Sequence, residues 1–330
     1  MFSTFRSLLF CLSLFCFPFS VLHAESLHIV TSLDPLEAKE YLKAFQEETK
    51  IDVTTIRLSA GEVLARLKAE KGNPTQSIWF GGPSLDYIAA KKEKLLQAYS
   101  SAVTQKMPQS FRDAEGFWTG IYFGSMAFVS YKPFLASKNI PAPTSWQDLL
   151  KPEFKNEIAV SFPYTSGTGF TLWAGLVQLM GEEKALEYWK GLDQNIRRYT
   201  QSGSGPVMEV AMGEAGFGIA FSQDAFRKAT SKGLPVVVSY PQEGTPYEIG
   251  AVAILAGAKE MESAKKFVDW IASPSAQNLM HQWGRYPILP GAKMPQGLGG
   301  PKEVKLITID PKMGLHREEL LQRWRQVMGR

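Results

Sequence analysis

Four short loops combine small or hydroxylated residues with the predicted start of a helix. They span residues 59–62 (SAGE), 81–84 (GGPS), 165–169 (TSGTG) and 202–206 (SGSGP). The first turn of a helix exposes unpaired backbone N–H groups at the positive end of the helix dipole, and glycine lets a ligand approach the backbone closely. Each loop follows, or nearly follows, a predicted strand, and the carboxyl ends of parallel strands meet in one crevice. The four loops together therefore predict an anion-binding site.

Each loop also has an interpretation that needs no ligand. Ser59 followed by Glu62 is a capping box, and for this loop capping is the favoured interpretation. Residues 165–169 place two hydroxyls and two glycines in a single turn beside Tyr164, which is more than one helix cap needs, so ligand contact is favoured there. In the loop 202–206 the proline suits the first turn of a helix, and both interpretations stay open.

The sequence shows no catalytic constellation. Beyond residue 24 the histidines are His28, His281 and His316, and none has a second histidine or a carboxylate at the spacing of metal ligands. The signatures H-E-x-x-H, G-x-S-x-G and S-x-x-K with its partner motifs are absent. We therefore expect no enzymatic activity, no cofactor and no bound catalytic metal. A secreted hydrolase remains as an alternative class.

Residues 1–24 are predicted to be a cleavable signal peptide. A lone positive charge at Arg6 precedes an uncharged apolar run over residues 8–21. The alternative is a membrane anchor, but the run is shorter than the ~20 residues that span a bilayer. Both cysteines, Cys11 and Cys16, lie in this segment and neither has a lipidation motif, so the mature chain has no thiol chemistry. The predicted location is the periplasm.

Composition excludes some classes of partner. The 36 basic and 32 acidic residues give a formal charge of +4, and the basic residues are scattered, so we expect no nucleic-acid binding. No later stretch is long and apolar enough for a membrane span. A chain of 330 residues that is 45% hydrophobic can bury the cores of two lobes.

Strand and helix patterns alternate along the chain and predict an α/β fold with a mostly parallel sheet and helices on both faces. Predicted strands cover residues 27–32, 51–58, 77–80, 158–162 and 218–221. Predicted helices start at Asp34, surround residues 63–67 and cover residues 145–150, 169–180, 263–272 and 317–327. Residues 287–301 are a predicted loop rich in glycine and proline.

Two stretches predict crossings between lobes. Residues 119–124 and 127–131 read as long strands with almost no helix between them, and residues 247–255 read as the return crossing. The predicted division after the signal peptide (1–24) is a discontinuous first lobe, 25–122 plus 248–300, and a second lobe, 123–247 plus 301–330.

Several loops resemble one family in both order and spacing. The matching segments are residues 80–82 (FGG), 163–169 (PYTSGTG), 201–204 (QSGS) and 243–250 (EGTPYEIG). They resemble the solute-binding proteins of ABC importers usually described as ferric-iron binding, a group that includes binders of hexose phosphates and of 2-aminoethylphosphonate. The resemblance covers essentially the whole mature chain. It implies a class II periplasmic binding protein, with two lobes that each hold a mixed, mostly parallel sheet, joined by hinge strands and closing over a ligand.

The resemblance bears on the choice between iron and an organic anion. In the iron-binding members adjacent tyrosines of the second lobe hold the metal, whereas this chain has FSQD at residues 221–224 and no adjacent tyrosines anywhere. Ferric iron is therefore the alternative ligand. The sugar-phosphate binders place a polar residue and an aspartate there, which correspond to Gln223 and Asp224. Because a histidine is expected before that aspartate, Gln223 argues against hexose phosphate specifically.

The polar remainder of the ligand needs acceptors. Asp224 is predicted to accept hydrogen bonds from hydroxyls or an ammonium group, and Glu248 near the return crossing to do the same. Glu243 is the alternative acid, in a loop. For each, an ordinary surface carboxylate is the competing interpretation, and the resemblance favours Asp224.

The sequence thus predicts a monomeric periplasmic binding protein for a small phosphate- or phosphonate-bearing organic anion, which it delivers to an inner-membrane ABC permease. No residue is assigned a catalytic or metal-binding role. The predicted ligand-binding residues are Ser32, Ser59, Gly81, Gly82, Ser166, Gly167, Thr168, Ser202, Ser204, Asp224 and Glu248.

Overall fold

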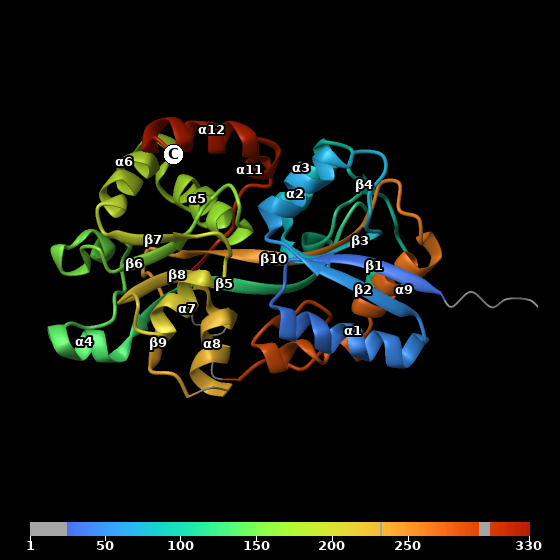
Figure 1. Cartoon of the computed structure of the whole chain (residues 1–330), viewed down its shortest axis with the longest axis horizontal. Helices are drawn as coiled ribbons and strands as arrows, with labels where there is room; N and C mark the ends of the chain where they lie inside the picture. The colour runs from blue at the N-terminus through green and yellow to red at the C-terminus, as the bar shows by residue number, and fades with distance from the viewer. Residues whose placement is uncertain (1–24, 232, 297–303) are drawn as a thin grey trace, which may run out of the picture.

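The computed structural model shows two α/β lobes side by side, connected by long strands (Figure 1). It describes residues 25–231, 233–296 and 304–330. The predicted signal peptide lies outside the described residues, as does part of the predicted loop 287–301. Within the described part, no helix is both long and apolar enough to cross a membrane.

The first lobe is built on strands β1, β2 and β3, which are parallel in the order β2-β1-β3. The strands are β1 (Ser26–Thr31), β2 (Asp52–Arg57) and β3 (Ile78–Pro83). Helices α1 (Pro35–Thr49) and α9 (Met261–Ile271) cover one face, and α2 (Ala60–Ala69) and α3 (Ser84–Lys92) cover the other (Figure 1). The predicted alternation of strand and helix is confirmed here.

The second lobe repeats this architecture with its own sheet. Strand β6 (Ile158–Ser161) pairs in parallel with β7 (Ile196–Thr200) and with β8 (Phe217–Phe221), and β9 (Val236–Ser239) pairs antiparallel with β5 (Thr119–Tyr131). Its helices are α4 (Lys132–Lys138), α5 (Gly167–Met180), α6 (Glu182–Asp193), α7 (Gly205–Ala211), α8 (Ser222–Ser231) and, at the C-terminus, α12 (Arg317–Met328).

Two antiparallel strands pass from one lobe into the other. β5 (Thr119–Tyr131) pairs with β10 (Thr245–Leu255) over its first half and with β8 over its second half. β5 is one continuous strand of 13 residues, so the sequence-based division into two strands was wrong. Its residues are almost all buried, so apolar and polar residues do not alternate along it. The sequence therefore has no two-residue period that would show that its two halves form one strand.

Three other elements differ locally from their prediction. Residues 145–150 form a 3₁₀ helix, Trp146–Leu150, that ends before Pro152, because a proline disfavours helical geometry in the residue before it. α5 begins at Gly167, two residues earlier than predicted, with Ser166 as its N-cap. β3 continues to Pro83 through Gly81 and Gly82, whose φ angles of 82° and 92° favour glycine.

Aromatic side chains dominate both cores. In the first lobe Phe45, Phe80 and Phe267 pack edge to face beneath the sheet. In the second lobe Trp189 packs edge to face against both Trp173 and Trp324, the latter from α12. Each lobe therefore has its own hydrophobic core, as a domain of this size requires.

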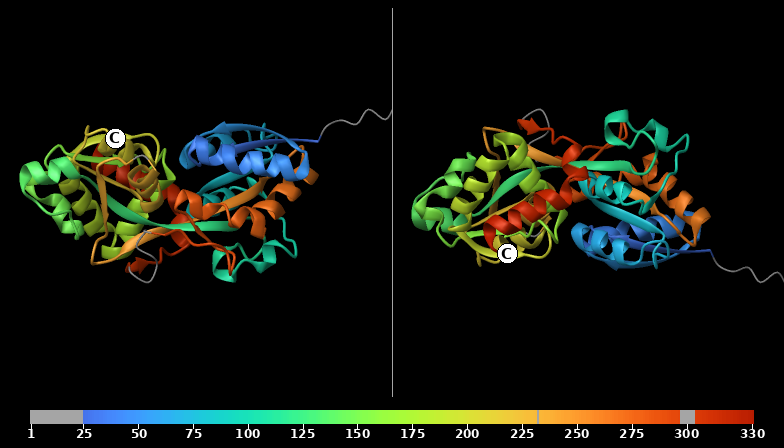
Figure 2. Two further views of the ribbon diagram at one scale, coloured as in Figure 1. Left: turned by 90° about the horizontal axis from the view of Figure 1, so that it is seen from below. Right: turned by 90° about the horizontal axis from the view of Figure 1, so that it is seen from above.

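The C-terminal segment touches both lobes (Figure 2). β12 (Leu306–Ile307) pairs with β10, α11 (Lys312–Leu315) packs on α3 of the first lobe, and α12 packs on the second. The remaining short elements are β4 (Leu96–Gln97), η1 (Thr104–Lys106), η2 (Gln109–Phe111), η4 (Pro152–Phe154), α10 (Pro274–Gln277), η5 (Met280–Trp283) and β11 (Tyr286–Pro287).

Candidate ligand-binding site between the lobes

A polar cleft lies between the lobes where helix starts from both sides converge. It has an empty volume of about 450 Å³, part of which is open to solvent. Most of the predicted site residues line it, namely Ser32, Ser59, Gly82, Ser166, Gly167, Thr168, Ser204, Asp224 and Glu248. The structure thus brings together loops that lie far apart in the sequence.

Gly81 and Ser202 lie outside this lining. The Gly81 carbonyl accepts a hydrogen bond from the Tyr87 hydroxyl at 2.9 Å, within the core of the first lobe. The Ser202 carbonyl accepts from the Thr200 hydroxyl at 2.8 Å and from the Gly205 N–H at 3.1 Å. Both residues therefore shape the turns that carry their neighbours, and neither faces the cleft.

Arg57 lies at the first-lobe end of the cleft, at the last position of β2. Its Nη1 donates to the Ser59 hydroxyl at 3.3 Å and its Nε to the Leu33 carbonyl at 3.5 Å. The Ser59 N–H donates to the Glu62 carboxylate at 2.8 Å, as the capping interpretation of this loop predicts. One guanidinium and one hydroxyl are thus held beside the start of α2, an arrangement that favours an anion.

The loops of the two lobes meet at glycines. The Gly61 N–H donates to the Thr165 carbonyl across the lobes at 3.0 Å. A Cβ atom added at Gly167 would lie 2.6 Å from Pro83 Cδ and 2.9 Å from Ala60 Cβ, closer than real contacts allow. Glycine at these positions therefore permits the close approach of the two lobes.

Hydroxyls of the second lobe complete this end of the cleft. The buried Ser166 hydroxyl accepts a hydrogen bond from the Gly169 N–H at 3.3 Å, which caps α5. Thr168 is on the first turn of the same helix, and Ser204 is at the start of α7. The loop 165–169 therefore combines a helix cap with a lining surface, so its two interpretations are compatible.

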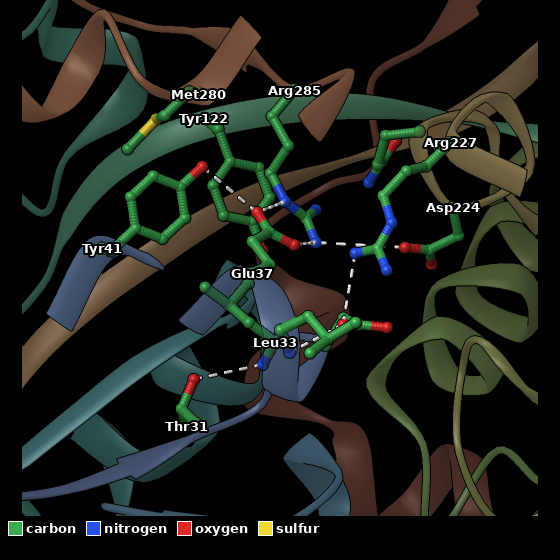
Figure 3. Close-up of polar contacts among 12 residues, drawn as sticks. Thr31, Leu33, Glu37, Tyr41, Tyr122, Asp224, Arg227, Met280 and Arg285 are labelled. Atoms are coloured by element: carbon green, nitrogen blue, oxygen red, sulfur yellow. Dashed lines mark hydrogen bonds and ion pairs between the residues drawn. The ribbon is translucent and has the colours of Figure 1, made fainter. Parts of the chain in front are cut away.

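Carboxylates surround Arg285, another residue of the cleft lining (Figure 3). Glu37 binds the guanidinium with both oxygens, at 2.5 Å from Nε and 2.8 Å from Nη2. Arg285 Nη1 lies 3.3 Å from Glu248 Oε1, and Nη2 lies 4.0 Å from Asp224 Oδ1. The guanidinium also stacks on the ring of Tyr122, with its central carbon 4.2 Å from the ring centroid.

Two other residues considered from the sequence, Gln223 and Glu243, do not line the cleft. Gln223 is buried and does not line the cleft, and its Nε2 donates to Glu248 Oε1 at 2.7 Å. Glu243 accepts a hydrogen bond from the Ser145 hydroxyl and does not line the cleft. Of the two glutamates left open by the sequence, Glu248 is therefore the one at the cleft.

Burial changes the ionisation of these acids. Loss of hydration raises the pKa of Glu248 to about 8, against the opposing effect of Arg285. The same cause raises the pKa of Asp224 to about 6. Burial also holds the pKa of the Tyr122 hydroxyl well above its usual value, so this phenol stays protonated at neutral pH.

A second ion pair spans the cleft between the lobes. Asp34, the N-cap of α1, lies 3.2 Å from Nη1 of Arg227 on α8. The Arg227 guanidinium stacks on the ring of Trp283 at 4.2 Å from its centroid. Asp34 also lines the cleft, so this pair joins the two walls at the edge of the site.

The histidines do not form a metal centre. In the described ranges, no group of three or more histidine, cysteine, aspartate or glutamate residues is arranged to hold a metal ion. His28 pairs with Glu260 at 2.9 Å and His316 with Glu319 at 2.8 Å. His281 Nδ1 contacts the carbonyl of Asn278 at 2.7 Å.

Sequence reasoning missed four ionisable residues of the lining. Asp34 and Arg57 each lie next to a strand end, so the rule that located the hydroxyl loops could have found them. Tyr122 lies within a hinge strand, and Arg285 follows η5 near the end of the first lobe. Nothing in the local pattern of these two residues marks them, because only the folded chain brings them to the cleft.

Comparison with known proteins places the chain in a family. The profile of the bacterial extracellular solute-binding proteins matches residues 40–305. The solved structure of the periplasmic binding protein AfuA from Actinobacillus pleuropneumoniae, with fructose-6-phosphate bound, is 32% identical. It superposes with a TM-score of 0.88, covering 92% of this chain and 98% of that one.

Three other similar proteins also cover most of the chain. A putative 2-aminoethylphosphonate-binding periplasmic protein of Salmonella typhi is 26% identical and covers 83% of this chain and 82% of its own. An uncharacterised protein of Haemophilus influenzae is 35% identical over 86% of this chain and 85% of its own. The apo ferric ion-binding protein A of Pasteurella haemolytica, at 22% identity, covers 92% of this chain and 98% of its own with a TM-score of 0.78, which shows a shared fold.

Proposed function

Because the chain belongs to the bacterial extracellular solute-binding proteins, we propose that it captures a small organic solute bearing a phosphate or phosphonate group. In this role it is the periplasmic solute-binding protein of an ABC importer. The solute is enclosed between the lobes and delivered to an inner-membrane permease. Delivery of an unchanged solute requires no catalytic group.

The observation that carries the proposal is that the cleft lining has two kinds of polar group: one set donates hydrogen bonds or is positively charged, and the other accepts hydrogen bonds. Arg57, the hydroxyls and the helix starts suit the anionic group, since each offers a donor or a positive charge. Asp224 and Glu248 are acceptors for the hydroxyl or ammonium groups of the remainder. The phosphate-bearing ligand of the similar protein AfuA supports this assignment.

Ferric iron is the alternative ligand, and the chemistry of this cleft argues against it. A hard ferric ion prefers ionised phenolate and carboxylate oxygens. Tyr122 is the tyrosine in the lining, and the raised pKa of its hydroxyl opposes ionisation. The iron-binding relatives share the fold at low identity, which supports no ligand assignment.

Calorimetry of the purified mature protein tests the proposal. We expect fructose 6-phosphate, 2-aminoethylphosphonate or a related compound to bind, to be recovered chemically unchanged and to be bound more weakly by the variant Ser166→Ala/Thr168→Ala. The control Thr171→Ala removes a buried hydroxyl from the same helix, outside the cleft lining, and should leave binding unchanged. Binding of ferric ion with a coloured charge-transfer band, and of no phosphate or phosphonate, would overturn the proposal.

A further inference from the structure

The carboxylate end of the cleft has more acids than bases. Glu37 and Asp224 lie beside the guanidinium of Arg285 (Figure 3), and Glu248 is the third carboxylate next to it. The side chains of Arg285, Glu37 and Glu248 are only 5%, 3% and 3% exposed, so water screens this cluster little. The positive charge of Arg285 thus cannot fully neutralise three carboxylates if all of them are ionised.

Glu37 takes the larger share of that positive charge. Its bidentate contact occupies Nε and Nη2 of Arg285, which leaves Nη1 for Glu248 at 3.3 Å. Asp224, at 4.0 Å from Nη2, is beyond hydrogen-bonding distance. Arg285 is therefore committed to Glu37 and is poorly placed to serve as the clamp for the ligand's anion.

The other groups around Glu248 do not neutralise the excess of acidic groups. Tyr41 on α1, Tyr87 on α3 and Tyr122 on β5 face the cluster, and burial holds the pKa of each hydroxyl well above its usual value. On α8, Gln223 is neutral and donates to Glu248. Arg227 is the second nearby cation, and it is paired with Asp34.

We propose that Glu37 and Arg285 are positioning residues that set how many protons Glu248 and Asp224 carry, and that solute binding in this cleft releases a proton. The proposal about release rests on the function proposed above. Neither Glu37 nor the bidentate pair needs to touch the solute, because the pair acts through the two carboxyls at the cleft.

The expected proton release follows from the chemistry of the cluster. A buried carboxyl without a full counter-charge favours its protonated form, which agrees with the pKa of about 8 for Glu248. Hydroxyl or ammonium donors of a solute stabilise the ionised form, so the proton of Glu248 passes to solvent when the solute binds. Release of one proton per solute makes the affinity rise about tenfold per pH unit, between pH 6 and 8.

Two substitutions should shift the ionisation in opposite directions. Glu37→Gln frees Arg285 to pair with Glu248 and Asp224, which lowers the pKa of both carboxyls. Arg285→Gln removes the cation that lies beside both carboxyls, which raises both pKa values. Damage to the fold alone would not produce opposite shifts, and Arg285→Lys should restore part of the original profile by returning a positive charge.

The first measurement needs no solute. Carboxyl ¹³C NMR of protein labelled in glutamate follows the titration of Glu248, assigned by its loss in Glu248→Gln. We expect a wild-type midpoint above that of ordinary glutamates, a midpoint lower by about one pH unit or more in Glu37→Gln, and a higher one in Arg285→Gln. Equal midpoints in all three proteins would overturn the role of Glu37 and Arg285.

The second measurement counts protons. Calorimetry with fructose 6-phosphate or 2-aminoethylphosphonate in buffers of different ionisation enthalpy gives the protons released per solute, and the solute's own ionisation cancels between variants. Release should fall in Glu37→Gln at pH 7, and a count equal to wild type would overturn the coupling.

A matched control separates this effect from the loss of any buried pair. Asp86 and Arg317 form another buried ion pair at 2.8 Å, between α3 and α12, outside the carboxylate cluster. Asp86→Asn should leave the Glu248 midpoint unchanged, and a shift as large as that of Glu37→Gln would contradict a specific role. If no phosphate or phosphonate binds, both the proposed function and the proposed proton release are wrong. The NMR titration would still show whether Glu37 and Arg285 control the pKa of Glu248.

Discussion

Two arginines line the cleft, and their contacts differ. Arg57 contacts the Ser59 hydroxyl and the Leu33 carbonyl, both uncharged. Arg285 is held by the carboxylate of Glu37 and stacks on Tyr122. A guanidinium without a fixed counter-charge is available to an incoming anion, whereas one in a bidentate carboxylate pair is not. The residue type alone did not distinguish them.

This difference predicts a specific loss of affinity in Arg57→Met. Charge-assisted hydrogen bonds contribute about 1.5–3 kcal/mol, so affinity for a phosphate-bearing solute should fall about 10- to 100-fold. Calorimetry at constant salt measures the loss. Arg66→Met on α2, where the guanidinium pairs with Glu70 at 2.8 Å, is the control and should change affinity little. Equal losses in both variants would mean that only overall charge matters.

At the scale of elements, the approach of α2 to α5 decides whether the cleft can close. The contact is made by the loops at the starts of both helices, where Gly167 faces Ala60 and Pro83. These two helices belong to different lobes, and the strands that precede them, β2 and β6, do not pair with each other. Their spacing therefore depends directly on the size of the residues at this contact.

Gly167→Ala should hold the lobes apart. Its methyl group would overlap Pro83 and Ala60, and such overpacking costs about 1–3 kcal/mol, which weakens solute binding about tenfold. Small-angle scattering should show a larger radius of gyration at saturating solute. In the control Gly191→Ala, within α6, the added methyl group would meet the flexible end of the Leu150 side chain at 3.3 Å, so binding and radius of gyration should stay as in wild type. An unchanged radius in Gly167→Ala would contradict this account.

The sequence predicted elements better than it predicted the site. Periodicity and helix caps identified many strands and helices of both lobes, because these signals lie within a few residues, although α4, α6, α8, β7 and β9 were not predicted individually. They also located the loops with Ser59, Ser166 and Ser204. Glu37 and Arg285 escaped prediction because 248 positions separate them in the chain, and neither has a local pattern that points to the other.

The continuous strand β5 shows a second limit. The sequence indicated strand on both sides of Ser125 but could not show that one strand serves two sheets. Pairing with β10 and then with β8 is a property of the assembled molecule. The assignment of residues to lobes near this strand remains a prediction.

At the scale of the whole molecule, ion pairs between side chains hold the lobes together at the cleft and beside it. Asp34 and Arg227 join the walls, and Asp86 and Arg317 join α3 to α12. The first pair is partly exposed, at 23% and 13%, so salt screens it, whereas the second is buried. The exposed pair is therefore the more adjustable connection between the lobes.

Arg227→Met should speed release of the solute. It removes the ion pair but keeps an apolar contact with Trp283, and an exposed pair of this kind contributes about 1 kcal/mol at most. We expect the dissociation rate in stopped flow to rise about fivefold, with a smaller difference at high salt. Arg323→Met, which removes a pair with Glu183 inside the second lobe, should not change the rate. A rate independent of Arg227 would show that the pair does not restrain opening.

The position of β10 in the sheet has a consequence for how the chain folds. β10 lies between β3 and β5, yet it follows β5 in the chain by more than one hundred residues. When the chain emerges N-terminus first, β3 and β5 must wait for a strand from the far end of the second lobe. Such long-range pairing slows folding and leaves apolar strand edges exposed in the interval. The first lobe, although it begins first, cannot complete its sheet until β10 has been added, and in that interval the edges of β3 and β5 stay unpaired.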